Sequence, residues 1–283
     1  MLAGKIGYFR ATAHPEAASW RTRVIANGGT VSASTFAAVE TFCRAIETAG
    51  IRDRFYRLNL FCGDSLASAL VPLYRGTSLS GGQLGSNADA NANFVSGDYS
   101  LSGGINNSTG ASTKALSTGL SANALPQLQT GHLSCAIMSY SSGNGFAMGI
   151  QQVNRFQTNL FVSNATSVSI GAANFSGDFG ASIAAAGARW MASRTSSTSG
   201  IAYRNGVQTV SQATAQSTRL NGATTLAVFG RTVSFDPATA GAVTGSAMTI
   251  RIGAYSIGDG MTAQQVSAFD TALANFFTAI GRS

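Results

Sequence analysis

The chain has 283 residues, of which only 10% are charged, with 18 Lys and Arg against 11 Asp and Glu and a net charge of +7. An ordinary globular domain is roughly a quarter charged, so this surface must owe its solubility largely to Ser, Thr, Asn, Gln and Gly. The last glutamate is Glu47, which disfavours enzymes that rely on paired glutamates. The basic residues form no run, whereas a nucleic-acid binder shows a dense basic stripe, so nucleic acid is not expected as a partner.

The sequence holds no apolar stretch of about 18 residues, so a membrane-spanning helix is not expected. Lys5 and Arg10 interrupt the N-terminal apolar run, which argues against a signal peptide. Cys43, Cys62 and Cys135 are odd in number and widely spaced, which fits neither a disulfide framework nor a zinc site. We expect them to be free, buried thiols in a chain that folds in a reducing cytosol.

The first 75 residues predict a small α-rich segment. An amphipathic helix is expected from Ser32 to Gly50, because apolar residues recur there at three- and four-residue spacing: Phe36, Val39, Phe42, Cys43 and Ile46. A short strand is expected over 57–61, and then a helical turn with Asp64 as its cap. The closely spaced Arg52, Arg54 and Arg57 are candidates for partner contacts. We interpret the segment 1–75 as a docking piece.

Residues 76–92 are rich in Gly, Ser and Asn and are expected to form a long connection. Beyond them the pattern is β, with turn residues at short intervals. Eleven strands are expected: 93–99, 115–120, 132–140, 146–152, 159–163, 168–172, 188–193, 201–204, 207–211, 225–230 and 248–255. Many short strands of this kind are typical of a sandwich, so residues 93–283 are predicted to form an antiparallel β-sandwich.

Two local patterns near the end of the chain give the most specific predictions, one of a turn and one of a helix start. Asn205-Gly206 separates two strand-like runs and favours a type I′ turn, because both residues tolerate positive φ. Thr262 and Gln265 match a capping box at the start of a helix. That helix has one apolar stripe, which should pack on the sandwich or on a neighbour: Val266, Phe269, Leu273, Phe276, Phe277 and Ile280.

Residues able to perform catalysis are sparse. A glycosidase needs two carboxyl groups across a cleft, and Asp178 or Asp236 could serve only singly. His14 and His132 lie beside no recognisable nucleophile motif, so we interpret them as loop or strand-edge residues. No catalytic residue and no cofactor is assigned, and the chain is not expected to be an enzyme.

Asn87, Asp89, Asn91 and Asn93 place side-chain oxygens at alternate positions, as in the first half of a calcium loop. The glycine and glutamate that complete such a loop are missing. We interpret the run as a polar loop that leads into a strand, with calcium bound near Asp89 and Asp98 as the alternative. No metal site is assigned.

Sugar binding requires an exposed aromatic ring beside amide groups. Tyr140 with Asn144, and Tyr203 with Asn205, are expected on rim loops, where binding residues usually collect. These four residues are the candidate glycan-binding set. Trp190, in contrast, is expected to be a core anchor of its strand.

Three segments of the second half carry a resemblance to a known fold: Ala188-Arg189-Trp190-Met191, the Tyr203-Arg204-Asn205-Gly206-Val207 hairpin, and the closing run 248–253. They resemble the second half of a concanavalin A-like, LamG-type jelly roll. The ending over 257–262 resembles that of LamG-like domains in bacteriophage proteins, and the part from Arg23 to Gly76 resembles a leader found with such domains in tailed-phage virions. The resemblance implies a jelly-roll virion component.

The leading hypothesis is therefore a non-enzymatic structural protein of a phage particle, either a head decoration or cement protein or a tail-associated subunit. It would be made in the host cytoplasm, enter the virion and act through contacts with capsid or tail proteins, as a homo-oligomer. The alternative is a receptor-recognition module of a fibre that binds a host surface glycan. A polysaccharide hydrolase is the third and least favoured class.

Overall fold

The computed structural model describes residues 12–78, 80–121, 124–125, 130–152, 156–163, 167–174, 179–181, 187–213, 224–234 and 242–282. The helical elements are α1 (Pro15–Ala26), α2 (Ala33–Thr48), α3 (Leu66–Ala69), α4 (Ala263–Ala279) and the 3-10 turns η1 (Arg52–Arg54) and η2 (Ser96–Asp98). The first strands are β1 (Phe55–Asn59), β2 (Tyr74–Arg75), β3 (Ala90–Ala92), β4 (Tyr99–Ser100), β5 (Gly104–Asn107), β6 (Ala115–Ser121) and β7 (Gly131–Gln152). The others are β8 (Phe156–Ser163), β9 (Ser167–Asn174), β10 (Phe179–Ala181), β11 (Ala188–Ser196), β12 (Ser199–Arg204), β13 (Val207–Gln212), β14 (Thr225–Val228), β15 (Gly230–Ser234), β16 (Ala242–Gly245) and β17 (Met248–Gly258).

The strands form two sheets that share β7. In the first sheet β7 lies between β17 and β11, with β1 and β2 beyond β17 and with β12 and β13 beyond β11. In the second sheet β7 lies between β8 and β14, with β9 and β10 on one side and β6 and β3 on the other. Among the described strands only β15 runs parallel to its neighbour β7. The expected antiparallel β-sandwich is confirmed.

The length of β7 was not anticipated. The two strands expected over 132–140 and 146–152 are one continuous strand, which pairs in the first sheet as far as Gly143 and in the second sheet from Asn144. Gly143 has φ +90°, and a Cβ there would lie 2.2 Å from the carbonyl oxygen of Ala247. The transfer of the strand between sheets therefore requires glycine at this position.

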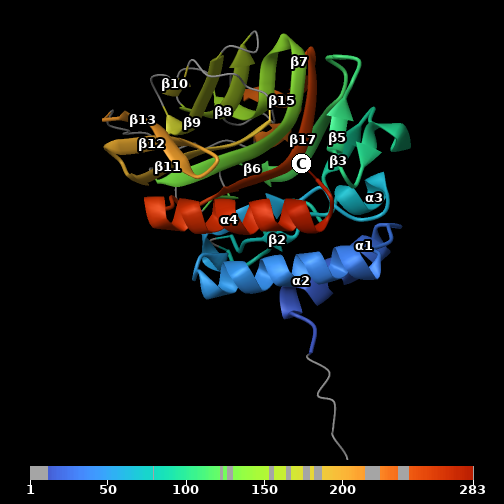
Figure 1. Ribbon diagram of the computed structural model, residues 1–283. Helices are drawn as coiled ribbons and strands as arrows, with labels where there is room; N and C mark the ends of the chain where they lie inside the picture. Colours follow the sequence, from blue (N-terminus) through green and yellow to red (C-terminus); the bar gives the residue numbers. More distant parts are fainter. Residues whose placement is uncertain are drawn as a thin grey trace, which may run out of the picture.

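The molecule has two hydrophobic cores. One core joins apolar side chains of both sheets, among them Cys135, Ile150 and Trp190. The other lies between the first sheet and the helices and contains Trp20, Phe42 and Phe269. Figure 1 shows α4 against the strands, with α2 and α1 on its far side. The first sheet is thus covered on both faces, by the second sheet and by a helical layer.

Local capping explains where the helices begin. The Ser32 side chain accepts a hydrogen bond from the Thr35 amide at the start of α2, and Thr262 and Gln265 form the expected capping box of α4. Both predicted helices are confirmed. The short α3 is capped by Ser65, and not by Asp64 as expected. Helix α1 was not predicted; its cap is the His14 side chain, which accepts from the Glu16 amide.

Other expectations were corrected by the strand positions. The β12–β13 hairpin is confirmed, with positive φ at both Asn205 and Gly206. The strand expected over 93–99 is wrong, because η2 occupies its middle. The strand expected over 225–230 is interrupted at Phe229, which has φ +60°, so that β14 and β15 are separate.

The described part of the N-terminal segment, residues 12–75, is packed into the sandwich through both its strands and its helices. β1 pairs with β17 in the first sheet, and Phe42 of α2 lies 5.8 Å from Phe276 of α4 between ring centroids. One hydrophobic core joins residues from Ala17 to Tyr74 with residues from Ala136 to Ile280. The boundary expected at residue 75 therefore falls inside a shared core.

Candidate functional site

The helical layer is the most distinctive addition to the sandwich, and aromatic side chains fix its position. Phe42 of α2, Phe55 of β1 and Phe269 of α4 meet with ring centroids 5.1 to 6.5 Å apart. Such edge and tilted contacts add to the burial energy of the rings. The layer cannot shift over the sheet without breaking these contacts, so surfaces built from α2 and α4 keep a fixed geometry.

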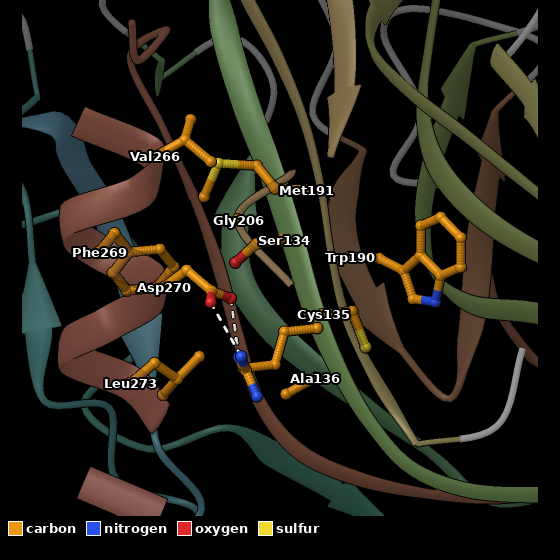
Figure 2. A pocket seen from close by; sticks show the side chains of 11 residues that line it. Ser134, Cys135, Ala136, Trp190, Met191, Gly206, Val266, Phe269, Asp270 and Leu273 are labelled. Carbon is orange, nitrogen blue, oxygen red and sulfur yellow. Dashed lines mark hydrogen bonds and ion pairs between the residues drawn. The ribbon is translucent and has the colours of Figure 1, made fainter. Parts of the chain in front are cut away.

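An ion pair ties the sheet to α4 at the edge of this layer. Nε and Nη2 of Arg189, on β11, donate to the two carboxylate oxygens of Asp270 at 2.7 and 2.8 Å (Figure 2). Behind the pair, the space between sheet and helix measures about 10 Å³, which barely reaches the volume of one water. The space between β11 and α4 therefore cannot hold a ligand, and the ion pair serves to hold the sheet and the helix together.

His132, at the start of β7, lies in a buried chain of polar groups. Its Nδ1 lies 2.7 Å from the carbonyl oxygen of Asp259 and its Nε2 lies 2.9 Å from Oγ of Ser256. Because a carbonyl only accepts, Nδ1 carries the proton, and the Ser256 hydroxyl donates to Nε2. Ser134 Oγ lies a further 2.6 Å from Ser256 Oγ. The pKa of His132 is lowered to about 4, chiefly by burial; the hydrogen bond to the Asp259 carbonyl opposes this shift, and the nearby Arg54 adds to it.

A histidine beside a serine hydroxyl is the arrangement that activates nucleophiles in hydrolases. Here the exposed fraction is 1% for His132 and 0% for Ser256. A substrate therefore has no access to this pair in the described structure. The interpretation of His132 as a strand-edge residue is correct in position, but its ring is part of the interior.

The two aspartates of the calcium alternative bind cationic side chains instead. Asp89 accepts from Nε and Nη2 of Arg57, from the Asn59 amide and from the Tyr255 hydroxyl. Both oxygens of Asp98 lie 2.7 Å from Nζ of Lys114. No cluster of three metal-ligating side chains occurs within the described part of the chain. In this structure the carboxylates of both aspartates are thus occupied by cationic side chains.

The candidate glycan-binding residues are not assembled into one surface. Tyr203 is 2% exposed and packs in the core below the helices, and Tyr140 is 8% exposed with its hydroxyl on the Gly143 carbonyl. The expectation that these two rings stand at the rims is therefore wrong. Asn144 and Asn205 are exposed, but Asn144 lies where β7 enters the second sheet and Asn205 lies in the β12–β13 turn.

The three candidate docking arginines have different surroundings. Arg57 is fully buried in its pair with Asp89, so its assignment as a partner contact is wrong. Arg52 binds Glu16 at 2.6 Å and lies over the ring of Tyr74. Arg54 donates to the carbonyl of Gly260. Arg52 and Arg54 keep part of their surface exposed, yet both also hold intramolecular contacts.

Other sequence expectations have clear outcomes. The three cysteines are free and buried, as expected. Trp190 is confirmed as a core anchor, and Figure 2 shows its indole pointing away from α4 while Met191 points toward it. His14 caps α1 and lies 3.2 Å from Glu47. Asp178 and Asp236 lie outside the described residues.

An open groove runs along the solvent side of the helical layer, between the end of α2 and α4. The residues that line it are all uncharged, and most are small: Ala45, Thr48, Ala49, Gln264, Ser267, Ala268, Thr271, Ala272 and Asn275. Sequence reasoning did not single out this surface. The buried faces of α2 and α4 could be read from their apolar periodicity, but which polar faces would lie side by side depends on how the helices pack.

Comparisons with known proteins bear on the fold. No family model matches the chain, and no curated protein matches its sequence. The binding domain of botulinum neurotoxin serotype D is 11% identical, with a TM-score of 0.50 over 78% of this chain and 52% of that chain. A heptameric SAP-like pentraxin from Limulus polyphemus is 15% identical, with a TM-score of 0.35 over 50% of this chain and 70% of that chain. A Trypanosoma rangeli sialidase is 10% identical, with a TM-score of 0.43 over 83% of this chain and 39% of that chain.

The chain thus spans about half the length of the toxin domain and about two fifths of the sialidase. The likeness to the toxin domain, at 11% identity, shows the fold alone. The chain is a concanavalin A-like β-sandwich with added N- and C-terminal helices. Among the described helices, none combines the length and hydropathy needed to cross a bilayer.

Proposed function

We propose that the protein is a non-enzymatic assembly subunit of a tailed-phage particle, on the head or associated with the tail, and that two copies meet through the α2–α4 groove. The attribution to a phage particle rests on two resemblances: residues 23–76 resemble a leader found in tailed-phage virion proteins, and residues 257–262 resemble the ending of LamG-like domains in bacteriophage proteins. The mode of assembly rests on the groove.

The absence of charge in the groove carries the proposal. Each copy bears a net charge of +7, so two copies repel each other over most of their surfaces. None of the residues that line the groove is charged, and depletion of charge is typical of interface cores. A second copy presents the same surface, which a two-fold axis can place against the first. The small side chains of Ala268 and Ala272 let the backbones approach closely.

The carboxylates of the described sandwich support a structural role. Asp89, Asp98 and Asp270 are each held by a cation from another element, and Asp259 accepts from the Tyr56 hydroxyl. Each of these groups stabilises packing between distant segments. In a catalytic pair of carboxylates, one group must instead face a cleft where it can give or take a proton.

The test measures the oligomeric state of the purified protein by light scattering and sedimentation. Dimers are expected, and they should become tighter as salt is raised, because salt screens the repulsion between the two positive copies. Thr271→Arg should abolish the dimer, while the control Gln208→Arg, which adds the same charge on the exposed β13, should leave it intact.

The same variants are then mixed with phage particles that lack the protein. Wild type and Gln208→Arg should bind the particles. A protein that stays monomeric at every salt concentration and fails to bind would contradict the proposal. Binding of an oligosaccharide by the monomer, in place of particle binding, would favour the glycan-recognition alternative.

A further inference from the structure

Four backbone carbonyl groups converge on the side chain of Arg282, three residues beyond the end of α4. Nη1 donates to the carbonyls of Leu60 and Gly253 at 3.0 and 2.7 Å. Nη2 donates to Phe61 and Leu101 at 2.9 and 2.7 Å, and Nε donates to Leu101 at 3.1 Å. A guanidinium has five N–H groups, so this carbonyl cage uses every donor of the side chain.

The carbonyl cage differs from the arginine sites that a carboxylate neutralises. Arg57 and Arg189 are neutralised by Asp89 and Asp270, but no salt bridge of the described residues includes Arg282. The Arg282 residue is only 3% exposed. Burial lowers its pKa to about 10. The charge is therefore stabilised by oriented backbone dipoles, in a place where an unpaired cation would otherwise be costly.

The carbonyl cage is assembled from segments far apart in the sequence. Leu60 and Phe61 follow β1, Leu101 follows β4, and Gly253 lies within β17. Phe61 has φ +43°, a conformation that is unfavourable for a bulky residue and survives only where the surroundings impose it. The Asn59 side chain accepts from the Phe61 amide at 2.9 Å and holds this turn. The ring of Phe277, on α4, lies 5.1 Å from Cζ of Arg282 and closes one side.

We propose that the carbonyl cage is a binding site for a guanidinium group, and that its resident ligand is Arg282 of the same chain, which fastens α4 over the first sheet. The planar fork of a guanidinium reaches four acceptors at once. A lysine ammonium has only three donors around one nitrogen and cannot do so. The site therefore takes alkylguanidinium compounds, and an empty cage leaves these four carbonyls without the donors that Arg282 supplies.

The experiment removes the resident ligand and supplies one in solution. Arg282→Ala should lower the melting temperature by about 10 °C, because buried acceptors lose their hydrogen bonds. Ethylguanidinium at millimolar concentration should restore about half of that loss in a saturable manner, whereas ethylammonium should not. The control Arg189→Ala removes an arginine that also contacts α4 but is paired with a carboxylate, and ethylguanidinium should not stabilise it.

Absence of a saturable rise for Arg282→Ala, or an equal rise for Arg189→Ala, would overturn the proposal. A second variant covers the case in which Arg282→Ala does not fold. Arg282→Lys keeps the charge and most of the apolar stem, so it should fold but melt well below wild type. A melting temperature equal to that of wild type would show that charge and stem packing suffice, and the site would not be specific for guanidinium.

Discussion

Arg57 and Asp89 form an ion pair that solvent does not reach. Nη2 of Arg57 lies 2.7 Å from Oδ1 of Asp89, and both side chains have an exposed fraction of zero. Tyr255 of β17 donates to the same carboxylate, and Nη1 of Arg57 donates to the carbonyl of Ser86. The pair therefore fastens the connection over 76–92 to β1 and β17 of the first sheet.

Removing one charge of this pair should be strongly destabilising. Asp89→Asn leaves Arg57 charged and buried without its counterion, and such a change costs about 3–5 kcal/mol. Urea unfolding should show this as a lower midpoint with an unchanged slope. The double variant Arg57→Met, Asp89→Leu removes both charges and should lose less than Asp89→Asn alone. A loss below about 1 kcal/mol for Asp89→Asn would mean that water enters and solvates Arg57.

The stability of the protein should fall in mild acid because of His132. Its pKa is lowered from 6.5 to about 4 in the folded state, so the unfolded chain takes up this proton first. The contribution of neutral His132 is complete above pH 6.5 and is lost as the pH falls toward 4, by about 3 kcal/mol in total. Urea unfolding from pH 7 to 4.5 measures it.

The control for this titration is His132→Gln, which keeps a donor and an acceptor but does not titrate in this range. Other acidic groups affect both proteins alike, so the difference in unfolding free energy between wild type and variant isolates His132. That difference should shrink as the pH falls. A difference that is constant with pH would contradict the buried, neutral imidazole.

Replacing Gly206 by alanine should destabilise the protein more than replacing Gly187, the other turn glycine compared. Both Gly206 and Gly187 have positive φ, but a Cβ at Gly206 would lie 3.1 Å from Cβ of Asp270, whereas Gly187 faces open space. Gly187→Ala should cost about 1 kcal/mol from backbone strain alone. Gly206→Ala should cost more, since it also pushes Asp270 away from Arg189. Thermal unfolding of both variants tests which loses more stability. Equal losses would show that α4 can move away from the new Cβ without a loss of stability.

Local sequence patterns were sufficient for the elements that depend on near neighbours. The start of α2 at Ser32, the capping box of α4 and the Asn205-Gly206 turn involve residues within four positions of one another. Hydrogen bonds of that range are determined by the local backbone. Helix α1 was missed because its cap is a histidine, which is not among the usual capping residues.

Contacts between distant residues decided the candidate site. Arg189 and Asp270 are 81 positions apart and Arg57 and Asp89 are 32 apart, and nothing in their surrounding sequence marks them as partners. Tyr203 was expected at a rim because it adjoins a turn. Strand alternation placed its ring on the face that α4 covers, so burial was set by a helix some 60 residues later.

The few charged residues of this chain show what sequence determines and what tertiary structure decides. Sequence alone determined that the protein is a strand-rich sandwich with capped helices, because periodicity and turn chemistry act over a few residues. Only the tertiary structure decided what the rare charged groups do. Asp89, Asp98 and Asp270 are each held by a cationic partner, and Arg282 is held by backbone carbonyls. The reason is that a buried charge is stable only where chain segments far apart in sequence bring it a partner.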